Sequence, residues 1–76
     1  MSRPDPRTLV AAALGCDPES LNATSALARH PKWDSFGHLR IMLQLEASYG
    51  IEVNDANIHK YETFAAIEAL FAEISA

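Results

Sequence analysis

The stretch that decides the fold spans residues 34–50 and reads DSFGHLRIMLQLEASYG. Asp34 can cap a helix that begins at Ser35, because an aspartate side chain accepts a backbone N–H of the first turn. Gly50 is a typical stop for such a helix. At about 100° per residue, its apolar side chains cover an arc of roughly 200°, wider than the stripe of a helix with one buried face. Either other helices contact this one on two sides, or part of the arc is an exposed docking patch.

A shorter helix and a long connection precede this segment. Pro6 can open the helix at its first position, with Asp5 as the cap and Gly15 as the end. Residues 16–33 then form a connection that can hold one helical turn at 18–21. A connection of this length is unusual in a compact domain and tends to be functional.

Two further helices are predicted towards the C-terminus. Asn54 or Asp55 can cap a brief third helix that runs through Tyr61, and Thr63 can cap a fourth. The fourth helix has one apolar face, formed by Phe64, Ile67, Leu70, Phe71 and Ile74. We therefore expect the chain, residues 1–76, to be a single all-α domain. It should be a small four-helix bundle with a long first loop and a short third helix.

The composition limits the partners and the location. The 76 residues carry a net charge of -4, and this mildly acidic balance disfavours nucleic-acid binding, which usually needs a basic face. Cys16 is the one cysteine, so an internal disulfide framework is excluded. No apolar run approaches the roughly 20 residues that span a bilayer, and residues 1–6 lack the apolar stretch of a signal peptide. We expect a cytoplasmic monomer without a membrane or nucleic-acid partner.

The start of the long helix also resembles a known family. The run from Trp33 to Leu39, WDSFGHL, looks like the start of the second helix of acyl carrier proteins, where an Asp-Ser-Leu-like motif occurs. The link at 50–53, GIEV, and the two closing helices fall at the spacings of that family. The resemblance covers essentially the whole chain and is weakest before residue 20. It implies that Ser35 receives phosphopantetheine from coenzyme A, through a dedicated transferase that uses magnesium, with Asp34 as part of the motif.

The position of Ser35 agrees with this implied role. The first backbone N–H groups of a helix lack intrahelical partners, and the positive end of the helix dipole lies there. A phosphodiester on Ser35 is therefore stabilised in the same way as other anions at helix starts. The simpler interpretation is that Ser35 or Asp34 is only an N-cap, worth about 1 kcal/mol. Both roles can coexist, with Asp34 as the cap and Ser35 as the attachment point.

The outer face of this helix differs from that of carriers that serve fatty-acid synthesis. Their second helix is usually acidic and docks onto basic patches of their enzymes. Here, those positions are occupied by Gly37, Arg40, Gln44 and Ala47. Because charge sets docking specificity, we expect a specialised carrier. The expected docking residues are Phe36, Leu39, Arg40, Leu43, Glu46 and Asp55. Phe36, Leu39 and Leu43 could equally be ordinary core residues, and both interpretations are open.

The resemblance implies a non-catalytic carrier that holds acyl intermediates as thioesters on phosphopantetheine and presents them to partner enzymes. The implied partners are a phosphopantetheinyl transferase, an acyl- or aminoacyl-loading ligase and downstream acyl-processing enzymes. One alternative is a stand-alone aminoacyl or peptidyl carrier with a dedicated ligase, because Phe36-Gly37 after the serine resembles carriers such as those for D-alanine. Another is an unmodified helical interaction module. The cargo and the pathway, fatty-acid or secondary-metabolite synthesis, are left open.

An enzyme is a further alternative, because Ser35 and His38 are three residues apart and can share a helix face. A hydrolase triad needs a third group that orients the base, and Asp34 is adjacent to the serine and cannot easily orient His38. The histidines show no metal-ligand spacing, so we expect no metal site and interpret them as surface or boundary residues: His30, His38 and His59. Trp33 is expected to pack the long connection against the helix.

Overall fold

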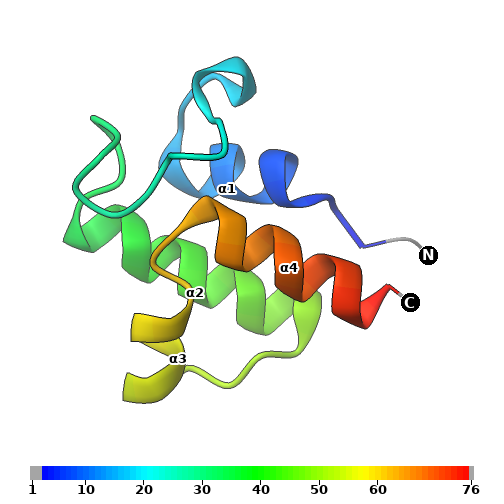
Figure 1. The fold of residues 1–76 in the computed structure, drawn as a ribbon. Coiled ribbons are helices and arrows are strands. Elements are labelled where there is room, and N and C mark those ends of the chain that lie inside the picture. Colours follow the sequence, from blue (N-terminus) through cyan, green and yellow to red (C-terminus); the bar gives the residue numbers. More distant parts are fainter. Residues whose placement is uncertain (1–2, 76) are drawn as a thin grey trace.

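The computed structural model describes residues 3–75, and these residues form four α-helices and one short 3₁₀ helix (Figure 1). The elements in chain order are α1 (Pro6–Leu14), η1 (Pro18–Ser20), α2 (Ser35–Tyr49), α3 (Asp55–Lys60) and α4 (Phe64–Ile74). The prediction of an all-α, carrier-like bundle is confirmed, including the long first loop and the short third helix. Among the described helices, none has the length and apolar character needed to cross a membrane.

Each α-helix begins directly after a residue that the sequence offered as its cap, and for α3 the cap is Asn54 rather than Asp55. The side chain of every cap accepts a backbone N–H three residues later, which satisfies one of the unpaired donors of the first turn. These caps are Asp5, Asp34, Asn54 and Thr63. Gly50 ends α2 with a φ of 73°, a left-handed conformation that glycine adopts without strain.

Helix α2 is the centre of the fold. Helix α1 packs along it, α3 contacts its side, and α4 packs against α1 and contributes to the same core, while the connection that follows α1 passes over the beginning of α2 (Figure 1). The inner side of α2 contributes Ile41, Met42 and Leu45, all fully buried. They contact a single apolar cluster, to which the other helices contribute Leu9, Val10, Leu14, Phe64, Ile67 and Leu70.

The connection between α1 and α2 is ordered by hydrogen bonds to the start of α4. The backbone carbonyl of Ser25 accepts the N–H of Phe64 at 2.9 Å, and the N–H of Leu27 donates to the carbonyl of Glu62 at 2.9 Å. Leu21 anchors the connection in the core with 1% of its surface exposed. The segment before α2 is thus held in place although it contains little regular secondary structure.

Tyr49, in the last turn of α2, should make stability depend on pH in the alkaline range. Its hydroxyl donates to the carbonyl of Pro4 at 2.7 Å, and burial, with a smaller contribution from Asp5, raises the pKa of Tyr49 from 10.0 to about 12. The folded state therefore keeps this proton to a higher pH than the unfolded state. The resulting stabilisation is complete below pH 10.0 and is lost as the pH rises through about 12.

Urea unfolding at stepped alkaline pH, compared between the wild type and Tyr49→Phe, measures this effect. The difference in unfolding free energy between the two proteins should shrink across that range, because only the wild type has this proton to lose. A difference that stays constant through the same range would contradict the assignment.

Candidate functional site

Ser35 is the first residue of α2, and its side chain is exposed. Asp34 caps the helix with its Oδ1 atom, which accepts the N–H of Gly37 at 2.8 Å, while its carbonyl accepts the N–H of His38 at 2.8 Å. The described hydrogen bonds thus satisfy the third and fourth N–H groups of α2 and leave those of Ser35 and Phe36 to solvent. An accessible hydroxyl therefore lies beside two free backbone donors.

This arrangement suits a negatively charged group attached to the hydroxyl of Ser35. The free N–H groups and the positive end of the α2 dipole both favour an anion, by about 0.3–1 kcal/mol at an exposed helix start. The carboxylate of the preceding residue, Asp34, accepts the N–H of Gly37. The free N–H groups at the start of α2 could therefore donate to a phosphodiester on this hydroxyl.

Gly37 brings the end of the connection into direct contact with α2. An ideal Cβ atom at this position would lie 2.5 Å from the carbonyl oxygen of Lys32 and 2.7 Å from Cδ2 of Leu14. Only a residue without a side chain fits so close to backbone. The sequence-based placement of Gly37 on the exposed polar face is therefore wrong: Gly37 is buried and holds the segment before Ser35 against the helix.

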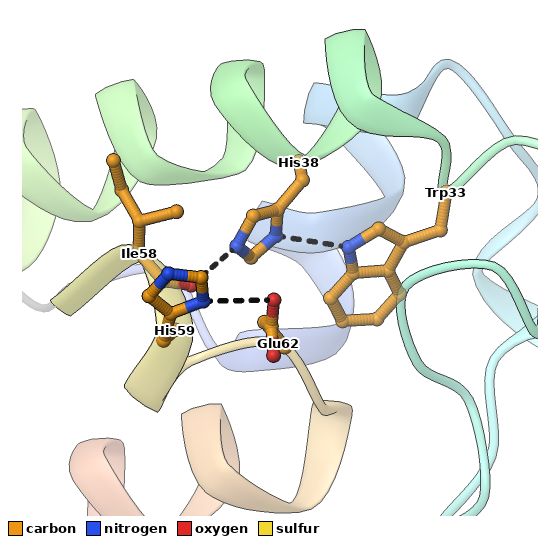
Figure 2. Close-up of polar contacts among 5 residues, drawn as sticks. All are labelled: Trp33, His38, Ile58, His59 and Glu62. Carbon is orange, nitrogen blue, oxygen red and sulfur yellow. Dashed lines mark hydrogen bonds and ion pairs between the residues drawn. The ribbon is translucent and has the colours of Figure 1, made fainter. Parts of the chain in front are cut away.

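A buried hydrogen-bonded bridge lies one turn after Ser35 (Figure 2). The indole N–H of Trp33 donates to Nδ1 of His38 at 3.0 Å, and Nε2 of His38 lies 2.7 Å from the carbonyl oxygen of Ile58 in α3. Because an indole N–H only donates and a carbonyl only accepts, His38 is the neutral tautomer with its proton on Nε2. The bridge links the residue before the Asp-Ser motif to the third helix.

The structure corrects one histidine interpretation and confirms another. His38 is only 4% exposed, so its interpretation as a surface or boundary residue is wrong. Both of its ring nitrogens are engaged away from Ser35, so it is not placed to act as a base for that hydroxyl. His59 is exposed and lies 3.4 Å from Glu62, an exposed pair of the kind that contributes little to stability (Figure 2). Trp33 is fully buried and packs the connection against α2, as predicted.

The apolar residues expected at the docking face are exposed, which decides between the two interpretations of the wide apolar arc. Phe36 is 75% exposed, Leu39 48% and Leu43 49%. With spacings of three, four and seven residues they share one side of α2, and Glu46 extends that side by one more turn. Asp55 is also exposed but belongs to α3, so the predicted docking residues come from two helices.

Arg40 lies on the same outer side of α2 but is bound to α1. Its Nε atom donates to the carbonyl oxygen of Ala13 at 2.8 Å, near the C-terminal end of α1. That end carries unpaired carbonyl groups and the negative pole of the helix dipole. The positive charge of Arg40 is therefore partly balanced within the protein.

Sequence reasoning missed the structural roles of Gly37 and His38. A glycine inside a strongly helical stretch costs about 1 kcal/mol relative to alanine, and this cost was the available signal for a close backbone approach. A histidine five residues after a tryptophan gave no comparable signal, because its second partner comes from another helix. Within residues 3–75, no cluster of histidine, cysteine and acidic side chains is arranged to hold a metal ion.

Comparison with known proteins assigns the family. A search for similar curated proteins finds no match. A family model described as the phosphopantetheine attachment site matches residues 7–71, which is most of the chain and includes the whole of α2. Domains of this family are non-catalytic carriers that bear phosphopantetheine as a covalent cofactor and act together with partner enzymes. The chain therefore belongs to the acyl carrier protein family, as a phosphopantetheine-binding carrier protein.

Proposed function

We propose that Ser35 is the attachment residue, and that the protein holds acyl intermediates as thioesters on the attached arm and presents them to partner enzymes. The observation that carries this proposal is the exposed hydroxyl of Ser35 at the start of α2, inside the matched region. When bound, the arm supplies a thiol on a flexible tether, which presents the acyl group to each partner enzyme at high effective concentration.

The other serines of the matched region are poor candidates for modification. The hydroxyl of Ser20 donates to the carbonyl of Asp17 at 2.6 Å. Ser25 is 5% exposed, and its hydroxyl accepts the N–H of Asn22. Ser48 lies half-buried inside α2, away from the free donors of the first turn. Of the four serines at 7–71, only Ser35 combines an exposed hydroxyl with a helix start.

The residues around Ser35 fit the arm through its phosphodiester. The backbone N–H groups of Ser35 and Phe36 are free to donate to phosphate oxygens, and Asp34 keeps the first turn in its conformation through Gly37. A carrier supplies the attachment point and the surface that partner enzymes recognise, while the cofactor supplies the reactive thiol. No side chain at the site therefore needs to act as an acid or base.

Co-expression with a phosphopantetheinyl transferase, followed by intact-mass measurement, tests the attachment. The wild type should gain the mass of one phosphopantetheine, and Ser35→Ala should gain none. Ser48→Ala, the matched control on the same helix, should be modified like the wild type. An unmodified wild type would overturn the carrier function and favour an unmodified interaction module. A gain that survives Ser35→Ala would overturn the site.

We further propose that partner enzymes dock on the outer side of α2, with apolar contacts as the main source of affinity. Phe36, Leu39 and Leu43 supply the exposed apolar surface, flanked by Glu46 on α2 and Asp55 on α3. Arg40 is exposed on the same side and keeps its positive charge, although its Nε donates to the carbonyl of Ala13. This face therefore suits an apolar partner surface better than a strongly basic one.

Leu43→Asp should lower kcat/KM for transfer of phosphopantetheine about tenfold, which corresponds to the loss of ~1.4 kcal/mol of contact energy in a docked complex. Ala69→Asp, an exposed position on α4, is the control and should leave kcat/KM close to that of the wild type. Raising the salt concentration should weaken docking of the wild type only slightly, because exposed charges contribute little. Equal effects of the two substitutions would place the docking surface elsewhere.

A dedicated ligase for a specialised acyl or aminoacyl group is the loading enzyme that this face favours. The exposed Phe36 directly follows the attachment serine, where it would contact such an enzyme first. Loading of the phosphopantetheinylated protein with fatty acids or with amino acids, compared for candidate ligases, distinguishes an acyl carrier from an aminoacyl carrier.

A further inference from the structure

A cavity of about 540 Å³ lies in the connection that precedes Ser35. Its volume is within the range of ~300–1,000 Å³ that is typical of small-molecule sites. The cavity is formed by the end of α1, by η1 and by the segment that leads into α2, and its last lining residue, Lys32, is three positions before Ser35. The lining residues are Gly15, Cys16, Asp17, Ser20, Asn22, Thr24, Ser25, Arg29, His30, Pro31 and Lys32.

The side chain of His30 bridges two walls of this cavity, one formed by η1 and the other by the segment that leads into α2. Its Nδ1 atom accepts the backbone N–H of Lys32 at 3.0 Å, so the ring proton lies on Nε2, which donates to Oγ of Ser20 at 2.9 Å. The hydroxyl of Ser20 in turn donates to the carbonyl of Asp17. The η1 wall and the wall beside α2 are therefore joined by a fixed side-chain brace rather than collapsed onto one another.

The backbone of one wall is strained. Ala28 has a φ of 69° and is the one non-glycine residue with a positive φ in the described part of the chain. An alanine in this left-handed conformation costs free energy, and such strain is commonly found at active sites and ligand-binding sites. The N–H of Ala28 donates to the carbonyl of Trp33 at 2.8 Å, which closes the strained turn. The next residue, Arg29, lines the cavity.

The lining offers hydrogen-bond donors and two positive side chains, Arg29 and Lys32, besides the carboxylate of Asp17, which accepts the N–H of Glu19. Among residues 3–75, the ion pair found joins His59 to Glu62, so neither Arg29 nor Lys32 is paired with an acidic side chain. The side-chain oxygen of Asn22 is used by Thr24, so the Asn22 amide group presents its N–H bonds. These groups suit a flexible polar chain with amide carbonyl oxygens and a nearby phosphate. The pantetheine arm has this chemistry.

We propose that the cavity holds the pantetheine arm of Ser35 when the arm is not delivering an acyl group. The inference depends on the proposed attachment at Ser35. The arm would leave Ser35, pass Lys32 and lie along the donor groups of the cavity, with its thiol end near the half-buried Cys16.

The phosphopantetheinylated protein offers a direct test, because it contains two thiols: that of the arm and that of Cys16. Diamide oxidises a pair of neighbouring thiols to a disulfide, taking up their two hydrogen atoms to become a hydrazine. In dilute protein, an arm held in the cavity should form the intramolecular disulfide with Cys16. Intact mass then falls by two hydrogen atoms, and both thiols resist alkylation.

The control places the cysteine outside the cavity and closer to the arm. The double variant Cys16→Ser/Leu39→Cys has its protein thiol on the exposed side of α2, one turn after Ser35. A stored arm should react with Cys16 about tenfold faster than with this exposed thiol, because storage raises the effective concentration at Cys16. Arg29→Ala should reduce that preference severalfold, whereas Lys60→Ala on α3 should not.

Backbone amide NMR spectra provide a second readout that does not depend on thiols. Attachment of the arm should shift the amide signals of Asn22, Ser25 and Lys32, in addition to the first turn of α2. Shifts confined to α2, or a faster reaction at Leu39→Cys than at Cys16, would overturn the cavity proposal alone. Failure of the wild type to gain the arm, measured first on the same sample, would overturn the proposed function and the cavity proposal together.

Discussion

Replacing Gly37 by valine is expected to destabilise the protein by about 3 kcal/mol, the upper end of the usual cost of overpacking a close contact. The first carbon of the new side chain would lie 2.5 Å from the carbonyl oxygen of Lys32, and 2.7 Å from Leu14. The oxygen belongs to backbone, so it cannot rotate away like the end of a side chain. A domain of this size has a stability of only about 0.05–0.15 kcal/mol per residue, so the loss is a large part of the total.

Urea unfolding measures the effect, with Ala47→Val as the matched control. Ala47 is exposed on α2, so the valine there introduces a branched side chain into the same helix without a clash, and should cost less than about 1 kcal/mol. The clash at Gly37 also displaces the segment before Ser35, so transfer of phosphopantetheine to Gly37→Val should be slower under conditions in which the variant is folded. Equal unfolding midpoints for the two variants would contradict the close approach.

Replacing His38 by leucine is expected to cost about 2–4 kcal/mol, because it leaves two polar groups without partners. The indole N–H of Trp33 is buried, and the carbonyl of Ile58 is partly buried. His38→Gln is the informative companion: its side-chain oxygen can accept from Trp33 while its amide donates to Ile58. We expect the glutamine variant to recover at least half of the stability that leucine loses.

Trp33→Phe, alone and combined with His38→Leu, separates the hydrogen bond from the packing of the two rings. If the bridge contributes as a unit, the two substitutions together should destabilise the protein by about 1 kcal/mol less than the sum of their separate effects. Additive losses would mean that the rings contribute through packing alone. Urea unfolding of the four proteins provides the complete cycle.

The elements of the fold that depend on local sequence could be predicted from it. The caps Asp34 and Thr63 and the stop Gly50 act within a few residues, so the ends of the helices followed from the sequence. The exposure of Phe36 could not be decided in this way. A wide apolar arc is compatible with two covering helices or with one open side, and only the placement of α1 and α4 distinguishes them.

In the candidate site, too, local features could be predicted from the sequence and contacts between elements could not. The position of Ser35 at a helix start is a local property, and it agrees with the sequence-based expectation. Gly37, His38 and Arg40 were misjudged or only partly understood, because the partner of each lies outside α2. These partners are the carbonyl oxygens of residues 32, 58 and 13, respectively. Contacts between elements are set by tertiary packing, which the spacing of residues within one helix does not encode.

The hydrogen bonds between the first connection and the start of α4 also affect the order in which the site is assembled during folding. Ser25 and Leu27 contact Phe64 and Glu62, nearly half of the chain away in sequence. Closing a loop of this length costs chain entropy before the contacts stabilise it, so such pairings tend to form late. We therefore expect α2 to acquire its helical structure early, whereas the segment before Ser35 becomes ordered only after the last helix has docked. A transferase that recognises this segment would then modify completed molecules and pass over partly folded ones.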